Sequence, residues 1–422
     1  MTAVTKIMTQ EKENIYGHKE VGGQMNKHHC RGCAHEDVRK FFDLGQMPLA
    51  GGFLSSLDDV AVEKLYPLEA HVCMKCGLVQ IVEPVDPKIL FLDYCFSSST
   101  VGPLVKHFED YARWLKEEFA PKSLVEIGCN DGILLGPLQT LGIKVIGVDV
   151  SDNITEIARE RGFDVVTGFF DPATAAKISE RVGKVDVVSG SNCFAHNEHP
   201  EVILEAARLI LKPTGKLCLE FMYAGDLLEQ LQWDTLYHEH LTFYSLGTLS
   251  TLLERFGFHV VHAEHLSMHG GSLRIVASMT REPPSEKMRE IQKYESEKGL
   301  NDPQTWMDFG TRADRKIAVV KDTLGRLSGN SSIWAYGAAG KATLWLNAGG
   351  MNYLEAVADS SPLRAGRFMP GTHTPIVFPE ELKKRPPDFI FISAWNYADI
   401  IMKKESWFKG IWLTPLPDLR FY

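Results

Sequence analysis

The chain has 422 residues, a formal net charge of −9, and 44% hydrophobic and 23% charged residues. This length predicts two to four domains of an ordinary globular protein. The negative charge argues against a general nucleic-acid partner, because binding to a phosphate backbone needs a positive surface. The sequence also lacks an uninterrupted apolar run of the roughly 18 residues that a membrane helix needs, so we expect no membrane partner.

Residues 1–27 are a polar N-terminal extension without the apolar centre of a secretion signal, so we expect a cytoplasmic protein. Residues 28–95 hold two Cys-x-x-Cys pairs, which predict a zinc-binding domain. Four thiolates can surround one Zn²⁺ as a closed structural tetrahedron, with no position left for a catalytic water. Two buried or redox-active cysteine pairs are the alternative. The predicted ligands are Cys30, Cys33, Cys73 and Cys76.

Residues 96–280 alternate between strand-like and helix-like runs, beginning with the strand KSLVEIGC and the helix DGILLGPLQTLG. Further strands are expected in KVIGVDVS, DVVTGFF, KVDVVSGSN and KLCLEFMY. Helices are expected in NITEIARERGF and in PEVILEAARLILKPTG, where the helix ends at Gly215. This alternation predicts βαβ units and a parallel sheet with helices on both faces, a Rossmann-like α/β fold.

Residues 281–330 are rich in charged side chains and predict exposed helices that connect two bodies. Residues 331–422 begin a second, smaller α/β domain with a strand at the start of SIWAYGAAGKATLWLN. Further strands are expected in YLEAVADSS, TPIVFP and PDFIFISAW. The whole chain is therefore expected to be an α/β protein with a small cysteine-bearing domain at its N-terminus.

The first loop of the central domain is VEIGCNDG, residues 125–132. Its glycines let the backbone turn tightly and approach a ligand, and the helix that follows directs N–H groups at that ligand. The spacing departs from the dinucleotide pattern, and the acidic residue that opens the loop suits an amino-acid ammonium better than a pyrophosphate. A plain tight turn is the alternative. The expected ligand contacts are Gly128, Asn130, Asp131 and Gly132.

Two more residues are expected at the carboxyl edge of the same sheet, where open α/β sheets bind ligands. Asp149 ends the second strand, where a carboxylate can accept both hydroxyls of a ribose. Asn192 ends the fourth strand. An adenosyl ligand without a pyrophosphate is S-adenosylmethionine, and we expect it as a cofactor.

The stretch WDTLYHEHLTFYS, residues 233–245, follows the strand KLCLEFMY and has three interpretations. Tyr237, His240 and Tyr244 have helical spacing and can form a packed face. His238 and His240 can bind a second metal ion, although no third ligand is evident. We favour an active site, because histidine suits proton transfer near neutral pH and tyrosine can donate to an oxyanion.

Two further glycine-containing segments carry candidate substrate contacts. HGGSLR, residues 269–274, is either a simple turn or the roof of a pocket, with His269 and Arg274 reaching a ligand. AYGAAGK places Lys341 where a helix begins, and the later segment PLRAGR adds Arg364 and Arg367. These residues either hold phosphates or substrate, or belong to a domain without a ligand.

In their order along the chain, these motifs together with FLDYCFSSST and MPGTHTPI resemble the sugar C-methyltransferases, which make C-3-branched deoxysugars. The likeness runs over roughly residues 28–422. It implies an N-terminal zinc-binding domain, a central Rossmann-like methyltransferase domain and a smaller C-terminal Rossmann-like domain. It also implies S-adenosylmethionine as the methyl donor and a nucleotide-linked 4-keto-deoxyhexose as the acceptor.

The resemblance also implies roles for individual residues. The family's Tyr-x-Glu-His motif falls on Tyr237, Glu239 and His240, and this chain has His238 where the family often has Asp. A substrate-facing tyrosine of the family falls on DYCF, where Tyr94 is the only tyrosine and Phe96 can take an aromatic position. His240 is then the base that removes the C-3 proton, and Tyr237 or Tyr94 donates to the enolate oxygen.

Three other functions remain open at this stage. One is a methyltransferase that acts on oxygen or nitrogen of another small molecule. The second is a non-catalytic protein that binds zinc and S-adenosylmethionine. The third is an NAD-dependent oxidoreductase that uses the C-terminal domain, against which the poor dinucleotide pattern argues. The sequence does not determine the nucleotide, the sugar, the stereochemistry at C-3 or the oligomeric state.

Overall fold

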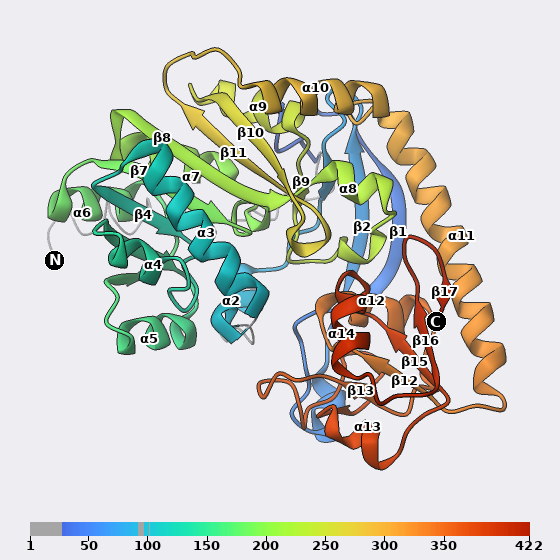
Figure 1. Ribbon diagram of the computed structural model, residues 1–422. Coiled ribbons are helices and arrows are strands. Elements are labelled where there is room, and N and C mark those ends of the chain that lie inside the picture. Colours follow the sequence, from blue (N-terminus) through green and yellow to red (C-terminus); the bar gives the residue numbers. More distant parts are fainter. Residues whose placement is uncertain (1–27, 92–96, 101) are drawn as a thin grey trace, which may run out of the picture.

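The computed structural model describes residues 28–91, 97–100 and 102–422 and contains three sheets (Figure 1). Candidate residues Tyr94 and Phe96 lie outside the described residues. The predicted α/β fold is confirmed, because two of the three sheets are built mainly from parallel strands separated by helices. The domain boundaries given above remain a prediction.

The N-terminal sheet is antiparallel, with the order β1-β2-β3-β9. Three of its strands are close in sequence. The fourth comes from the histidine-rich stretch, residues 233–245, and pairs Phe243 with Val79. The strands are β1 (Val38–Pro48), β2 (Leu65–Cys73), β3 (Val79–Ile81) and β9 (Thr242–Phe243). The segment after the candidate base thus completes the sheet of the cysteine-bearing domain.

The central sheet has seven strands in the order β10-β11-β8-β7-β4-β5-β6, with only β11 antiparallel to its neighbours. Its strands are β4 (Ser123–Ile127), β5 (Lys144–Asp149), β6 (Val165–Thr167), β7 (Val185–Ser191), β8 (Leu211–Met222), β10 (His259–Leu266) and β11 (Ser272–Ser278). One predicted boundary was wrong. The helix expected to end at Gly215 ends at Ile210, because Leu211 already pairs with Val185 of β7.

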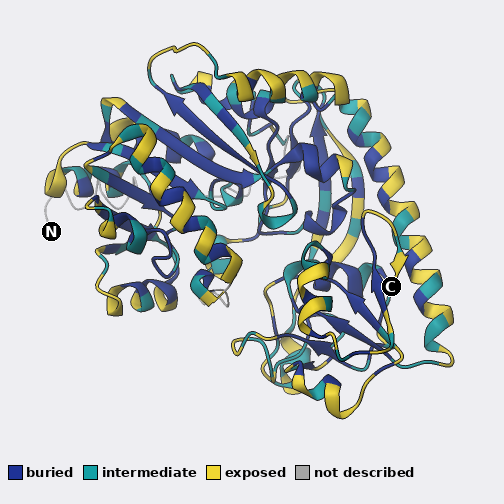
Figure 2. Cartoon of the chain, viewed as in Figure 1, coloured by how far each residue is buried: buried dark blue, intermediate teal, exposed yellow. Residues whose placement is uncertain are grey.

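Helices cover both faces of the central sheet, with exposed residues outward and buried residues against the strands (Figures 1 and 2). In α3 the buried residues Leu104, Phe108, Tyr111 and Leu115 recur every three to four positions, which places them on one face. The helices are α3 (Gly102–Phe119), α4 (Leu135–Thr140), α5 (Asp152–Glu160), α6 (Pro172–Val182), α7 (Pro200–Ile210), α8 (Ala224–Glu229) and α9 (Leu246–Arg255). Short helical turns are α2 (Pro87–Phe91), η1 (Leu57–Val62), η2 (Ser98–Thr100), η3 (Phe194–His196), η4 (Trp233–Thr235) and η5 (Met268–Gly270).

Two helices, α10 (Glu286–Lys298) and α11 (Pro303–Ser328), connect the central and C-terminal sheets. The long helix α11 runs along the outside of β1 (Figure 1). It begins where the Asp302 side chain accepts from the Gln304 N–H and Pro303 fills the first turn, a common start for a helix. Its buried residues form one stripe and pack in a core shared with the N-terminal and C-terminal sheets, so α11 is not a free linker.

The C-terminal sheet has the order β14-β13-β12-β15-β16-β17, with only β17 antiparallel. Its strands are β12 (Ile333–Tyr336), β13 (Val357–Ala358), β14 (Ile376–Val377), β15 (Phe389–Ile392), β16 (Ile411–Thr414) and β17 (Arg420–Phe421). Its helices are α12 (Gly340–Ala348), α13 (Glu380–Lys384) and α14 (Ala398–Lys404), with the turn η6 (Trp395–Tyr397).

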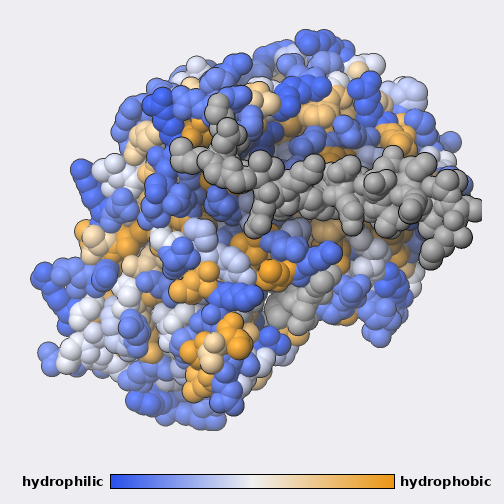
Figure 3. Space-filling view, turned by 180° about the vertical axis from the view of Figure 1, so that it is seen from behind, coloured by the Kyte–Doolittle hydropathy of each residue, from blue (hydrophilic) through white to orange (hydrophobic). Residues whose placement is uncertain are grey.

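Helix α12 packs against η4, the turn that opens the histidine-rich stretch. The rings of Trp233 and Trp345 meet edge to face at 4.5 Å between centroids, and the Thr343 hydroxyl donates to the Ala50 carbonyl. The C-terminal domain therefore touches both other domains beside the candidate catalytic residues. Among the described residues, no helix has the length and apolar character to cross a membrane. The face in Figure 3 is mostly hydrophilic, with hydrophobic residues in separate groups.

Candidate active site and metal site

The four cysteines of the N-terminal domain converge on one point. Their sulfur atoms all lie within 4.8 Å of one another, and the pairs Cys30–Cys76 and Cys33–Cys73 are each 3.6 Å apart. A tetrahedron with Zn–S bonds near 2.3 Å places its sulfurs about 3.8 Å apart, so this cluster fits a zinc ion. The hydrogen bond with Cys76 holds the pKa of Cys30 below its ordinary value.

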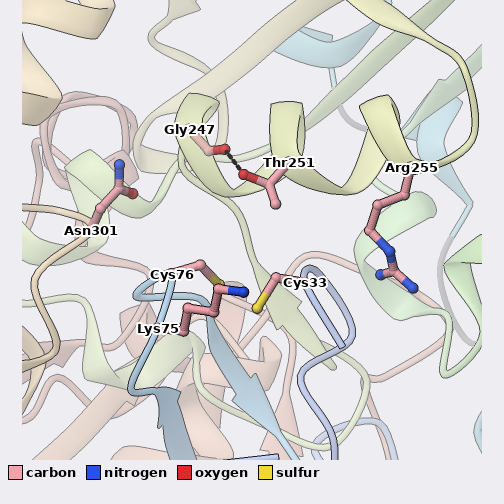
Figure 4. Close-up of a pocket in the computed structure, with 7 residues that line it drawn as sticks. All are labelled: Cys33, Lys75, Cys76, Gly247, Thr251, Arg255 and Asn301. Carbon is pink, nitrogen blue, oxygen red and sulfur yellow. Dashed lines mark hydrogen bonds between the residues drawn. The ribbon is translucent and has the colours of Figure 1, made fainter. Parts of the chain in front are cut away.

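A cavity of about 460 Å³ opens beside this cluster, between the cysteine loops and helix α9 (Figure 4). Its lining residues are Cys33, Lys75, Cys76, Gly247, Thr251, Arg255 and Asn301. None of these is a predicted catalytic or S-adenosylmethionine-binding residue. The cavity thus belongs to the surroundings of the cysteine cluster and not to the candidate active site.

The glycine loop after β4 is held by the serines that follow the aromatic segment FLDYCF. The Asp131 carboxylate accepts from the Ser97 hydroxyl at 2.5 Å and from the Ser99 N–H at 3.1 Å. The Asn130 side chain accepts from the Ser98 N–H at 2.9 Å. Gly132 has φ +83°, and a Cβ there would overlap the ring of Phe163, so only glycine fits this turn.

Asp149 ends β5 and supports the same loop. Its carboxylate accepts from the backbone N–H groups of Asn130 and Ser151 at 2.9 and 3.0 Å. A carboxylate has about four acceptor positions, so two remain for the hydroxyls of a ribose. Asn192 lies after β7 with a positive φ of 54°, and its N–H donates to the Glu220 carbonyl. Both predicted residues therefore lie at the carboxyl edge of the central sheet.

The acidic residues of this loop fit a cationic ligand. Glu126 is buried, and burial together with the charges of Asp149 and Asp131 raises its pKa well above the usual range. One oxygen of Glu126 and one of Asp131 are buried and have no hydrogen-bond partner among the described residues. Buried polar atoms nearly always have partners. The methionine ammonium of S-adenosylmethionine would supply hydrogen bonds and positive charge, and its sulfonium would add positive charge only, so these residues fit S-adenosylmethionine.

His240 is held in one orientation and one tautomer. Its Nδ1 lies 2.7 Å from the backbone carbonyl oxygen of Thr235. A carbonyl only accepts hydrogen bonds, so Nδ1 carries the proton and Nε2 keeps its lone pair. Burial, and then the proximity of His196 and of Lys341, holds the pKa of His240 well below 6.5. His240 is therefore neutral at neutral pH and able to accept a proton at Nε2.

The other members of the motif surround this base. The rings of Tyr237 and His240 lie 4.0 Å apart between centroids. The buried Glu239 side chain lies against Gly51 of the N-terminal domain. His238 is buried and packs edge-on against Tyr66 of β2. The segment forms a turn after η4 and not a helix, so the interpretation of a packed helical face was wrong. Among the described residues, the four cysteines are the group of three or more potential metal ligands that converges, and no such group includes His238 or His240.

Lys341 and His269 reach this region from two other elements. Gly340 lies so close to Tyr237 that a Cβ on it would approach the tyrosine hydroxyl to 3.2 Å, which places the start of α12 beside the motif. Lys341 follows, with its Nζ 4.4 Å from the ring centroid of Trp395. Burial, and then nearby His107 and Lys341, lowers the pKa of His269 to about 4. The structure thus brings two predicted substrate contacts toward the base.

Arg364 occupies a different position. Its guanidinium pairs with Asp359 at 3.4 Å, and Asp359 also accepts from the N–H groups of Ala338 and Ser361 at 2.7 and 2.8 Å. Arg364 therefore lies beside the glycine loop of the C-terminal domain and is tied to its second strand. Its contact with substrate remains a prediction.

The possible ligand contact of Arg274 is not supported. Arg274 is buried, its Nε donates to Glu220 at 2.5 Å, and its guanidinium lies 4.1 Å from the ring centroid of Tyr111. Glu220 also pairs with His107 at 2.8 Å. The side chain is used inside the protein, between β11, β8 and α3.

Several residues of the site were not identified from the sequence. His196 lies 5.0 Å from His240 between ring centroids, and burial lowers its pKa to about 4. His196 comes four residues after Asn192, at the carboxyl edge of the sheet. This position is the feature of the sequence that could have identified it as a site residue. Ser97 and Ser99 reach the glycine loop, and the Asp234 carboxylate accepts from two tryptophans. Those contacts join distant segments and left no local signal.

Comparison with known proteins gives three matching family profiles. Residues 30–91 match a putative zinc-binding domain, residues 105–263 a methyltransferase domain and residues 267–417 a C-methyltransferase C-terminal domain. C-methyltransferase NovU of Streptomyces niveus is 31% identical over 402 residues, which cover 93% of this chain and 96% of that protein.

Other similarities cover only part of the chain. A ubiquinone biosynthesis O-methyltransferase of Cupriavidus pinatubonensis is 32% identical over 98 residues, 23% of this chain and 39% of that protein. The CcbJ methyltransferase structure from Streptomyces caelestis has 16% identity and a TM-score of 0.33, and the match covers 40% of this chain and 88% of that one. These partial matches add nothing to the family assignment.

The match to NovU extends over nearly the full length of both chains, and the three profiles follow the order of the three sheets. The zinc-binding profile also covers all four converging cysteines. The cofactors are thus S-adenosylmethionine and a structural zinc ion. The chain belongs to the C-methyltransferase family that its motifs resemble, with an N-terminal zinc-binding domain, and it is an S-adenosylmethionine-dependent C-methyltransferase.

Proposed function

We propose that this enzyme methylates C-3 of a nucleotide-linked 4-keto-deoxyhexose through an enolate, in the biosynthesis of branched deoxysugars. The observation that carries this proposal is His240, a buried neutral histidine whose Nδ1 is fixed on the Thr235 carbonyl. Transfer to oxygen or nitrogen uses a lone pair that the acceptor already has. Transfer to carbon first needs a carbanion, and a positioned base is the group that makes one.

The ketone of the acceptor makes a histidine base strong enough to form the carbanion. A carbonyl at C-4 acidifies the hydrogen on C-3, and His240 Nε2 removes that proton. The electrons of the C–H bond form a C-3=C-4 double bond, and the negative charge moves to the C-4 oxygen. Tyr237, with its ring against His240, is the proposed hydrogen-bond donor to that oxygen. A base of this kind typically contributes about 10²–10⁴ in rate and an oxyanion donor about 10²–10³.

The methyl donor is proposed to lie on the loop after β4, held by Gly128, Asn130, Asp131, Gly132, Asp149 and Asn192. When bound, S-adenosylmethionine supplies a methyl group on a sulfonium, which C-3 attacks while S-adenosylhomocysteine leaves. The buried oxygens of Glu126 and Asp131, for which the described residues offer no hydrogen-bond partner, support the position of the methionine ammonium near this loop. His240 then returns its proton to solvent for the next turnover.

Two assays on the same variant test this proposal. The enzyme is incubated in D₂O with S-adenosylhomocysteine and a panel of nucleotide 4-keto-6-deoxyhexoses, and deuterium at C-3 is measured. A second assay uses S-adenosylmethionine and measures a gain of one methyl group in mass. We expect the wild type to catalyse both reactions with at least one acceptor and His240→Asn to catalyse neither.

The matched control is His238→Asn, since this neighbouring histidine packs against Tyr66 and has no proposed chemical role. We expect His238→Asn to retain exchange and methylation. Normal exchange in His240→Asn would contradict the assignment of the base. Absence of a methyl gain with every 4-keto sugar in the wild type would contradict the proposed acceptor class.

A further inference from the structure

A buried carboxylate and a buried ammonium lie together where the C-terminal domain meets the histidine-rich stretch. Asp234, in η4, is completely buried. Its Oδ2 accepts from the indole N–H of Trp345 at 2.9 Å and from that of Trp395 at 2.8 Å. Its Oδ1 is also buried but has no hydrogen-bond partner in the part of the chain that the structure describes.

Lys341, at the start of α12, is the ammonium. Its Nζ is buried, has no hydrogen-bond partner within residues 28–91, 97–100 and 102–422, and lies 4.4 Å from the ring centroid of Trp395. The same indole therefore supports the lysine with its ring and the aspartate with its N–H. The negative charge of Asp234 stabilises the ammonium of Lys341, although the two side chains form no direct hydrogen bond. Each side chain keeps an unused polar atom.

Such a pair is unusual inside a protein, because buried donors and acceptors almost always have partners. A missing partner at one group can be a packing accident. Two unpartnered groups of opposite charge that share one tryptophan indicate that a third group belongs with them. That group has to accept a hydrogen bond from the ammonium and donate one to the carboxylate.

The position of the pair connects it with the reaction. Lys341 follows Gly340, which approaches the hydroxyl of Tyr237, and Asp234 precedes the Thr235 carbonyl that orients His240. Lys341 is therefore close to the proposed base and oxyanion donor, and Asp234 is the chain neighbour of the residue that orients the base. A substrate group bound by the pair would lie near the proposed base.

The chemistry of the pair selects one class of group. A phosphate would be repelled by Asp234, and a keto oxygen cannot donate to it. A hydroxyl satisfies both atoms at once, because it accepts from Lys341 and donates to Asp234. We propose that Asp234 and Lys341 together bind one hydroxyl of the acceptor, and this inference rests on the proposed function.

The test uses acceptors that differ by one hydroxyl. Beginning with the best 4-keto sugar nucleotide, analogues are prepared that each lack one hydroxyl of the hexose or of the nucleotide ribose. For the wild type we expect one analogue to lose about 10- to 100-fold in kcat/KM, the usual effect of leaving a buried polar pair unsatisfied. The position of the missing hydroxyl shows whether it comes from the hexose or the ribose.

Lys341→Met and Asp234→Asn are then measured with the parent acceptor and with that analogue. We expect both variants to lose about 10- to 100-fold on the parent and little on the analogue, so that the preference disappears. A purely structural role would lower kcat/KM equally for both acceptors. Lys384→Met on the exposed face of α13 is the matched control and is expected to keep the preference.

The possible outcomes are distinct. If every single-hydroxyl analogue is turned over as well as the parent by the wild type, the subsite is wrong, and no variant is needed to show it. An unchanged preference in Lys341→Met or in Asp234→Asn also overturns it. Failure of the wild type to methylate any parent acceptor overturns the proposed function, and the subsite with it.

Discussion

Arg274→Met is expected to destabilise the protein strongly without a direct effect on ligand binding. The methionine keeps most of the side-chain volume but removes the hydrogen bond at 2.5 Å to Glu220 and the contact with Tyr111. Glu220 is only 2% exposed, so its carboxylate stays buried with His107 as its remaining partner. Breaking a buried ion pair in this way costs about 3–5 kcal/mol.

The effect should depend on pH in a defined direction. Burial alone would raise the pKa of Glu220, but the bonds from His107 and Arg274 outweigh burial and lower it. In the wild type the pair therefore stabilises the fold above the carboxyl's unfolded pKa, and this stabilisation is lost as the pH falls through the lower folded pKa. In the variant the carboxyl pKa rises. The stability difference should thus be full at pH 7 and shrink as the pH falls toward about 4.3.

Thermal unfolding followed by calorimetry measures this effect, with Glu220→Gln/Arg274→Met as the matched control. The single variant should unfold about 6–20 °C below the wild type. The double variant should recover at least half of that loss, since it no longer buries an unpaired charge. A single variant with near wild-type melting but weaker substrate binding would refute this reasoning and return Arg274 to the ligand site.

Three further predictions concern the cofactors and the base. Because the pKa of His240 is held below 6.5, kcat/KM should be constant from about pH 7 to 8 and fall only in more acidic solution; an acid limb centred above pH 6.5 would contradict this. Asp149→Ala should weaken the binding of S-adenosylmethionine by about 10- to 100-fold, as measured by titration calorimetry. Replacement of the exposed Asp164 by alanine is the control, and an unchanged affinity in Asp149→Ala would remove Asp149 from the site. Cys33→Ser should lower bound zinc, measured by elemental analysis, and lower the melting temperature; stoichiometric zinc in that variant would contradict the ligand set.

The sequence was most informative where structure is local. The strands β4, β5 and β7 are short apolar runs bounded by turn residues, and each lies where periodicity predicted it. The extent of β8 was missed because Lys212 and Pro213 look like a helix end, whereas pairing with β7 extends the strand back to Leu211. The two-residue strand β9 is defined only by its partner β3. No local pattern identifies a strand of that length.

The same distinction holds at the site. The loop from Gly128 to Gly132 is contiguous, so its turn and its acidic character could be predicted from adjacent residues. The tautomer of His240 depends on a backbone carbonyl at Thr235, which has no side-chain signature. The unsatisfied oxygen of Asp234 is evident only once two tryptophans from the C-terminal domain are in place.

The pairing of β3 with β9 has a consequence for synthesis of the chain on the ribosome. Strand β3 emerges with the cysteine loops and its partner β2, but its other partner, β9, follows only after β4 to β8 have been made. Until then the β3 edge of the N-terminal sheet is open, and open edges can pair with the wrong strand. The short length of β3 limits this hazard. The arrival of β9 closes this edge, whereas the catalytic turn just before it is complete only when Trp345 and Trp395 of the C-terminal domain have reached Asp234.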